Sequence, residues 1–194
     1  NGPAGCGKSH LSLIKALDLI QQPGSVYEKL YIITPSVEMT KNGIGYLPGS
    51  FADKMMYYMN SVYKILDKTL TKEVSARLIK DGTIESLGLG YLRGENIENS
   101  ILIVEEAQNI SKKEMLTILT RLGENAKLII SGDIIQIDAF NRKEESGLYH
   151  AMEKLKGINK IACFEFTDED IVRHPLISLI LEKYNEKEIN KLCF

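Results

Sequence analysis

The segment that most restricts how this chain folds is a glycine-rich stretch at its beginning. Residues 2–9 read GPAGCGKS and match the pattern G-x-x-x-x-G-K-[ST] at every fixed position. Glycines permit the tight turn in which successive backbone N–H groups surround one phosphate. A helix beginning at Ser9 would direct its positive end at the same anion. The segment therefore predicts a phosphate-binding loop, since an ordinary glycine-rich turn would not need the lysine and the helix that follow it.

Two side chains of this loop complete a site for a nucleoside triphosphate. The Lys8 ammonium suits the β- and γ-phosphates, and the Ser9 hydroxyl is a ligand for Mg²⁺. We therefore expect ATP with Mg²⁺ as the bound species.

Short apolar runs alternate with helical patterns along the rest of the chain. Runs rich in β-branched or aromatic residues predict buried strands at 30–34, 101–104, 127–131 and 161–166. Helical spacing of apolar residues predicts helices within 9–21, 50–66, 111–122, 147–155 and 175–184. This alternation predicts an α/β fold, with a parallel sheet covered by helices on both faces, formed by residues 1–194 as a single domain.

Composition excludes several other classes of protein. Apolar residues make up 44% of the chain and charged residues 26%, which is ordinary for a folded domain with a core. A net charge of -2 gives no general attraction to nucleic acid or to anionic membranes, and no apolar run is long enough to span a bilayer. The three cysteines, Cys6, Cys163 and Cys193, form no CxxC pair, which disfavours a zinc site and fits a reducing compartment such as the cytoplasm.

The position of the phosphate-binding loop in the chain is unusual. Such loops normally follow a strand, yet only one residue precedes Gly2. We therefore expect that this sequence is part of a longer protein whose upstream residues supply a central strand.

Two adjacent carboxylates follow the apolar run at 101–104. We expect Glu105 to hold Mg²⁺ and Glu106 to orient and deprotonate the attacking water, because acids at such a strand end do this in enzymes with the same loop. Neighbouring residues on a strand point in different directions, so the two carboxylates can serve separate tasks. The alternative is a solvated pair at a strand end, which the phosphate-binding loop makes less attractive.

The run at 127–131 also ends in polar residues, with Asp133, Gln136 and Asp138 after Ser131. A polar side chain here can touch the γ-phosphate or its attacking water. Ser-Gly-Asp is equally a good turn sequence. Spacing alone leaves both interpretations open.

Taken together, these motifs resemble the PhoH-like family of phosphate-starvation-inducible P-loop ATPases. The resemblance extends from Gly2 to about Tyr184 and rests on eight motifs in order. They are GPAGCGKS at 2–9, GYLPG at 45–49, YLRG at 91–94, EAQN at 106–109, TRLG at 120–123, SGD with QID at 131–138, SGL at 146–148 and VRHPL at 172–176. The loop motif is generic, whereas the ordered set is specific.

The resemblance implies a sheet like that of RecA and of superfamily 1 helicases, with the 131–133 strand between the phosphate-loop strand and the Glu105 strand. It implies that Asp133 and Gln136 sense the γ-phosphate. It also implies that Arg173 and Arg121 are candidates to neutralise transition-state charge, with a helix-end salt bridge as the alternative for each. An arginine supplied by a neighbouring subunit would imply a homo-oligomer, and the family also suggests RNA or another single-stranded nucleic acid as a partner.

The expected site residues fall into three groups. Those expected to act in hydrolysis are Glu106, Lys8, Arg173 and Gln136. Those expected to contact the nucleotide are Gly2, Pro3, Ala4, Gly5, Cys6, Gly7, Lys8, Ser9, His10 and Asp133. Those expected to hold Mg²⁺ are Ser9 and Glu105.

The departure of Glu105 from the family pattern, together with the missing first strand, leaves a second function open, and a departure at Thr34 concerns a contact with nucleic acid. The family usually has aspartate where this chain has Glu105, and a basic residue where it has Thr34. The first affects the expected rate of hydrolysis more than binding, so an ATP-binding switch with negligible hydrolysis is the alternative to an ATPase. A small-molecule kinase with the same loop is disfavoured, because its lid needs clustered arginines and the five present are dispersed.

Overall fold

The computed structural model describes residues 1–35, 60, 62–92 and 96–172, and four parallel strands form one sheet in this part of the chain. The strands are β1 (Lys29–Ile33), β2 (Ile84–Ser86), β3 (Ser100–Val104) and β4 (Lys127–Ile130), in the order β2-β1-β3-β4. The prediction of a parallel α/β fold is therefore confirmed, as is the prediction that the strand leading to Asp133 lies beside the Glu105 strand.

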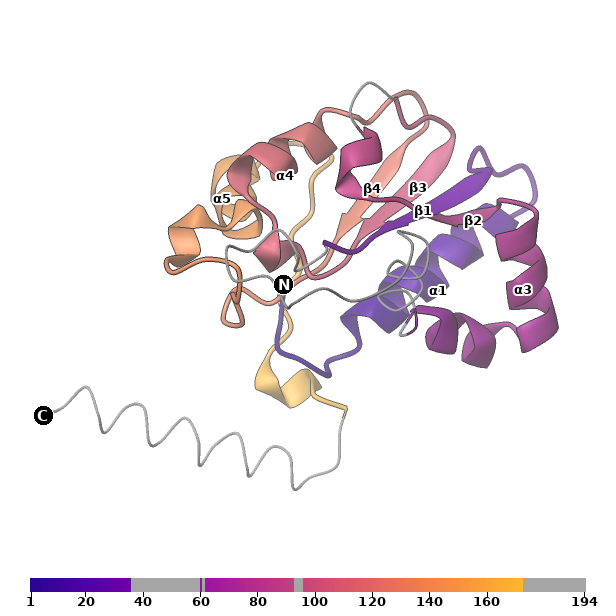
Figure 1. Ribbon diagram of the computed structural model, residues 1–194, viewed down its shortest axis with the longest axis horizontal. Coiled ribbons are helices and arrows are strands. Elements are labelled where there is room, and N and C mark those ends of the chain that lie inside the picture. The colour runs from indigo at the N-terminus through magenta and orange to yellow at the C-terminus, as the bar shows by residue number, and fades with distance from the viewer. Residues whose placement is uncertain (36–59, 61, 93–95, 173–194) are drawn as a thin grey trace, which may run out of the picture.

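Strand register brings the polar strand ends together. β1 pairs with β3 from Lys29 opposite Ser100 to Ile33 opposite Val104, and Val104 in turn lies opposite Ile130 of β4. Because the strands are parallel, whatever follows these three ends lies on one edge of the sheet. In Figure 1 the strands run toward the side of the molecule on which the N-terminal loop lies.

Helices cover both faces of the sheet. The helices α1 (Lys8–Gln21) and α3 (Lys72–Lys80) lie on one face, and α4 (Lys112–Leu119) and α5 (Gly147–Leu155) lie on the other (Figure 1). The described residues also contain the short 3₁₀ helices η2 (Leu89–Leu92), η3 (Ala107–Asn109), η4 (Lys143–Glu145) and η5 (Asp168–Asp170).

Alternation of side chains along β3 explains why helices cover both faces of the sheet. Ile101 and Ile103 pack with α1, whereas Leu102 and Val104 pack with α4 and α5, and all four are fully buried. A strand without a polar face can be stable only between two layers. The apolar composition of 101–104 thus places this strand, and the acids that follow it, at the centre of the fold.

Several predicted boundaries are confirmed. α5 has the predicted bounds, and α4 begins with the predicted capping box, in which the Ser111 hydroxyl accepts the Glu114 N–H at 3.3 Å and the Glu114 carboxylate accepts the Ser111 N–H at 3.0 Å. The predicted helix at 50–66 falls mostly outside the described residues, although 62–69 are helical. The predicted helix at 175–184 lies wholly outside them. Sequence patterns missed α3, in which four of nine residues are charged, and β2, which has only three residues.

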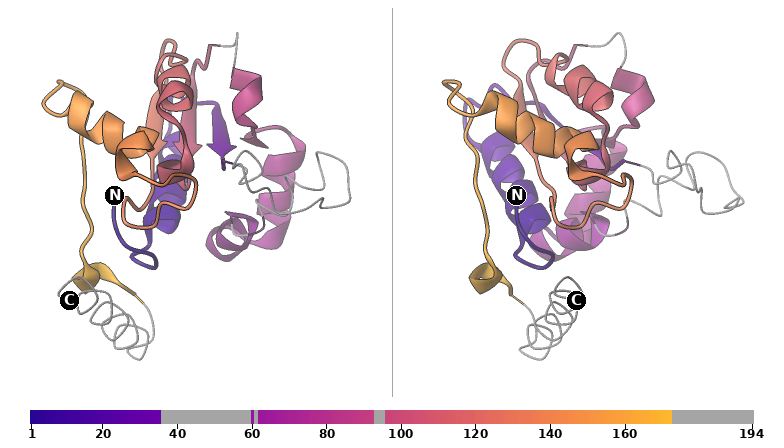
Figure 2. Two further views of the ribbon diagram at one scale, coloured as in Figure 1. Left: turned by 60° about the vertical axis from the view of Figure 1, so that its left-hand side comes forward. Right: turned by 90° about the vertical axis from the view of Figure 1, so that its left-hand side faces the viewer.

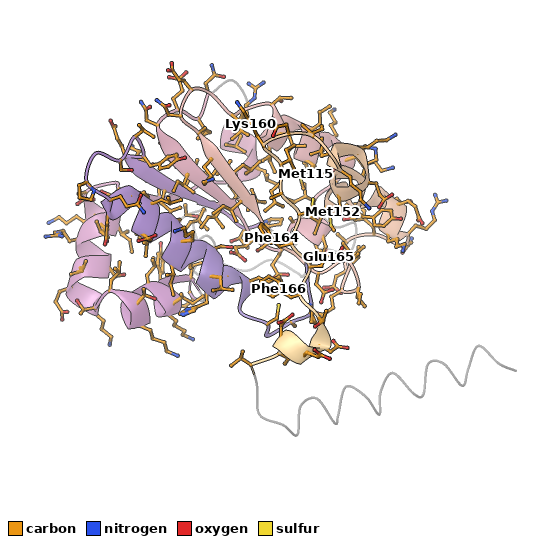
Figure 3. The ribbon with its side chains drawn as sticks, turned by 180° about the vertical axis from the view of Figure 1, so that it is seen from behind. Met115, Met152, Lys160, Phe164, Glu165 and Phe166 are labelled. Atoms are coloured by element: carbon orange, nitrogen blue, oxygen red, sulfur yellow. The ribbon has the colours of Figure 1, made fainter. Side chains whose placement is uncertain are left out.

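The predicted strand at 161–166 is wrong in the described structure. Apart from a turn in which the Ile161 N–H donates to the Ile158 carbonyl at 3.1 Å, its backbone hydrogen bonds run to Asn1: the Asn1 amino group donates to the Phe164 carbonyl, and the Phe166 N–H donates to the Asn1 carbonyl, both at 2.9 Å. One residue cannot form a ladder, so the segment stays extended but unpaired, and Phe164 is 73% exposed. Figure 2 shows the segment running from α5 to η5 beside the N-terminus, and Figure 3 labels its aromatic residues. The strand expected before Gly2 stays a prediction.

Among the described helices, none is long and apolar enough to cross a membrane.

Candidate nucleotide site

The predicted phosphate-binding loop leads directly into α1. Gly5 and Gly7 have φ angles of 91° and 84°, in the left-handed region that side chains rarely adopt. Gly7 is the N-cap of α1, so no side chain caps the helix, and its first turn contains no acidic residue. The first N–H groups of a helix have no partner within the helix. They are therefore free to bind an anion.

Lys8 points back into the loop. Its ammonium donates to the carbonyl of Gly2 at 2.6 Å and to that of Pro3 at 2.8 Å. The beginning of the loop is tightly packed, because a Cβ added to Gly2 would come within 2.6 Å of the Cβ of Phe166. Figure 3 shows Phe166 beside this end of the loop. The extended segment after α5 thus supports the loop from outside the sheet.

Glu105 joins the loop to two strand ends. One carboxylate oxygen, Oε2, accepts hydrogen bonds from the Ser9 hydroxyl at 2.6 Å and the Ser131 hydroxyl at 2.8 Å. The residue is only 6% exposed, and its other oxygen, Oε1, is buried without a hydrogen-bond partner among the described residues. Burial is the main cause that raises the pKa of this carboxyl. A buried, incompletely bonded carboxylate beside a hydroxyl offers oxygen ligands of the kind that Mg²⁺ prefers.

This burial predicts how stability depends on pH. The folded protein holds the Glu105 proton more tightly than the unfolded chain, so the free energy of unfolding should fall as pH rises above the ordinary value of 4.5. Glu105→Gln removes this loss, and the nucleotide-free variant should melt at a higher temperature than the wild type at pH 8. The difference should shrink toward pH 4.5 in thermal melts without Mg²⁺. A difference that is the same at both pH values would contradict this expectation.

Glu106 differs from Glu105 in burial, since Glu105 is buried and Glu106 is exposed. Its backbone is left-handed, with φ 50° and ψ 36°, which costs about 1–2 kcal/mol for a residue with a side chain. Its side chain is exposed, and its Oε2 accepts a hydrogen bond from the Gln108 side chain at 2.8 Å. One carboxylate is thus buried against the loop and the other faces solvent.

Asp133 lies beside these acids and is 6% exposed. Its Oδ1 accepts the N–H of Ile135 at 2.9 Å, so it closes a turn, while its own N–H donates to the Gln108 side chain at 3.1 Å. The hydrogen bond to Ile135 is therefore a turn contact of the kind that the Ser-Gly-Asp sequence favours. Because β3 and β4 are parallel neighbours, Asp133 also lies at the same edge of the sheet as Glu105. Gln136 is bonded to Asp133 only through its backbone N–H, and its side chain is exposed.

Of the other predicted residues, two are described and lie apart from this group. His10 is exposed on α1, and Arg173 lies outside the described residues. Arg121 follows α4, and its carbonyl accepts the Ile97 N–H at 2.8 Å, near the amino end of β3. Glu105 follows the opposite end of that strand, so Arg121 lies at the end of the sheet away from Glu105.

The sequence alone predicted no role for Ser131 or Gln108, although Ser131 belongs to the SGD motif and Gln108 to the EAQN motif. Ser131 bonds the buried acid, and Gln108 bonds both Glu106 and the backbone of Asp133. Their position in SGD and EAQN was the only signal. Neither motif shows by itself that the two strand ends touch.

Gly132 lies against Gln108 and Leu148 and should not tolerate a side chain. An added Cβ would lie 2.6 Å from both the Gln108 Oε1 and the Leu148 Cδ2, and 3.0 Å from the Gln108 backbone nitrogen. Such overpacking typically costs about 1–3 kcal/mol, so Gly132→Ala should lower the free energy of unfolding by that amount. Gly90→Ala is the control, since nothing lies within 4 Å of its added Cβ, and it should change stability by less than about 0.5 kcal/mol. Equal denaturant midpoints for the two variants would count against this packing.

Comparison with known proteins shows the family of the chain. The family described as "PhoH-like protein" matches residues 1–185. A PhoH-like protein of Bacillus subtilis (strain 168) is 38% identical over 186 residues, which are 96% of this chain and 57% of that relative. Protein PhoH of Escherichia coli (strain K12) is 34% identical over 188 residues, 95% of this chain and 51% of that relative. The chain thus spans about half the length of the relatives it matches. It belongs to the PhoH-like protein family.

Proposed function

We propose that this chain binds ATP with Mg²⁺ and hydrolyses it. The observation that carries the proposal is the 2.6 Å hydrogen bond from the Ser9 hydroxyl to the Glu105 carboxylate. It joins the loop suited to phosphates to the acidic strand end, across 96 residues of sequence. A purely structural turn would not need a buried, incompletely bonded carboxylate at that place.

Phosphate binding is the first step that the residues support. The uncapped N–H groups of α1 and the glycine-rich backbone are suited to surround the β- and γ-phosphates. Lys8 would exchange its two carbonyl acceptors for phosphate oxygens, which are stronger acceptors because they are charged. Ser9 and Glu105 would hold Mg²⁺, which supplies charge neutralisation on the phosphate oxygens.

Hydrolysis needs a group that positions and deprotonates water. Glu106 is the exposed carboxylate beside the loop, so it can accept a proton from a water in line with the γ-phosphate. Asp133 and Gln136 lie on the next strand end and would respond to the γ-phosphate or its loss. Arg173 would neutralise transition-state charge, in keeping with the family resemblance.

The proposal also includes binding partners and a cellular compartment. The family resemblance suggests RNA or another single-stranded nucleic acid, and an arginine acting between subunits implies a homo-oligomer. The described cysteines, Cys6 and Cys163, are free, which agrees with a reducing compartment such as the cytoplasm.

Two measurements on the protein encoded by the complete gene test the proposal. Calorimetric titration with Mg·ATP should show saturable binding, and phosphate release should continue over many turnovers. Saturable binding without phosphate release would instead favour the ATP-dependent switch, for which the motivating observation is Glu105 in place of aspartate. Adding single-stranded RNA at several salt concentrations tests that partner, because phosphate contacts weaken steeply as salt rises.

A further inference from the structure

Gln108 is a buried polar side chain that forms a hydrogen bond with Glu106. It lies in the short helix η3 and is only 2% exposed. A buried amide must find partners for both of its ends, and a residue that fails to do so destabilises the fold. Both ends of this amide have partners, and both partners belong to the proposed site.

Chemistry allows only one orientation of this amide. Its Oε1 accepts the backbone N–H of Asp133 at 3.1 Å, and its Nε2 donates to the Glu106 carboxylate at 2.8 Å. A backbone N–H can only donate and a carboxylate only accepts, so turning the amide over would break both bonds. The Asp133 backbone therefore determines which end of Gln108 faces Glu106.

Packing holds the amide in place from the other side. The space left by Gly132 is filled by the Gln108 Oε1 and by Leu148, as the 2.6 Å approaches to an added Cβ demonstrate. Glu106, by contrast, has an exposed side chain, and its bond to Gln108 is the one side-chain hydrogen bond of its carboxylate within the described residues. An exposed glutamate without this bond would sample several rotamers.

We propose that Gln108 is the positioning residue for Glu106, holding the carboxylate at a constant place relative to the Asp133 strand end. The inference rests on the proposed function, because it concerns the group that activates water. Gln108 itself does not touch the substrate. It limits where the Glu106 oxygen can lie, and small displacements of a reacting group lower rates strongly.

A double-mutant cycle separates this role from a general loss of structure. Gln108→Met keeps the length of the side chain and removes both hydrogen bonds. We expect kcat for ATP hydrolysis to fall about 10- to 100-fold while the Kd for Mg·ATP changes by less than about threefold. In a Glu106→Gln background the same substitution should lower kcat by less than about twofold, because the group it positions is already gone.

A second variant and a control keep the result interpretable. Gln108→Glu retains an acceptor for the Asp133 N–H but sets a second carboxylate against Glu106, so it should also lower kcat with little change in Kd. Ser100→Ala removes another buried hydrogen bond, from the Ser100 hydroxyl to the Glu98 carbonyl at the far end of β3, and should leave kcat unchanged. Thermal melts of all variants show whether each is folded at the assay temperature.

The outcomes distinguish this inference from the function on which it rests. Equal losses of kcat from Gln108→Met in both backgrounds would overturn the positioning role and leave ATP hydrolysis standing. A large rise in Kd without a change in kcat would overturn it as well. Absence of turnover by the wild type would overturn both. A loss of kcat from Gln108→Met that occurs only in the background that retains Glu106 would support the proposal.

Discussion

Lys8→Ala should weaken Mg·ATP binding by about 10- to 150-fold, and it should lower hydrolysis by two to three orders of magnitude. The ammonium already lies inside the loop, donating to two loop carbonyls, and no other lysine or arginine belongs to residues 1–9. A hydrogen bond to a charged group contributes about 1.5–3 kcal/mol, and a preorganised donor at a developing charge contributes about 2.7–4 kcal/mol to catalysis. Calorimetry and phosphate-release assays measure the two effects separately.

Lys15→Ala is the matched control for this substitution. Lys15 lies on the same helix and forms an exposed ion pair with Asp18 at 2.7 Å. Exposed pairs contribute little to stability, so this variant should bind and hydrolyse ATP as the wild type does. If Lys8→Ala retained wild-type affinity while Lys15→Ala did not, the loop would not be the phosphate site.

Glu106→Gln should lower kcat by about 10²- to 10⁴-fold while leaving Mg·ATP affinity within about threefold. The amide that replaces the carboxylate cannot accept the proton of the attacking water, and general-base catalysis contributes rate factors of this size. Affinity should survive because the loop and Glu105 are unchanged, and because the Glu106 side chain is exposed rather than packed in the core. Single-turnover phosphate release, beside a binding titration, measures both quantities.

Glu124→Gln provides the comparison for Glu106. Glu124 is exposed, and its carbonyl accepts the Asn99 N–H near the amino end of β3, away from the loop. This variant should keep wild-type kcat. Unchanged turnover in Glu106→Gln would mean that another group activates the water, and the proposed roles of Glu106 and Gln108 would both fail.

Local patterns sufficed where one segment determines its own structure. The loop needs left-handed backbone at Gly5 and Gly7, and only glycine adopts it easily. The apolar run at 101–104 needs cover on both faces, and Ser111 with Glu114 begins a helix through contacts three residues apart. Where a segment depends on a neighbour, as at 161–166, the same reasoning failed, because a strand exists only when another strand pairs with it.

The sequence by itself determined the backbone of the glycine-rich loop, the parallel α/β class and the family, because each depends on local backbone preference or on an ordered set of motifs. Only the tertiary structure decided which side chains meet. Ser9, Glu105 and Ser131 converge because α1 begins where β3 and β4 end, at one edge of the sheet. Gln108 reaches both Glu106 and Asp133 because β3 and β4 are neighbours there. Contacts between residues far apart in the chain depend on strand order and register, which no single segment encodes.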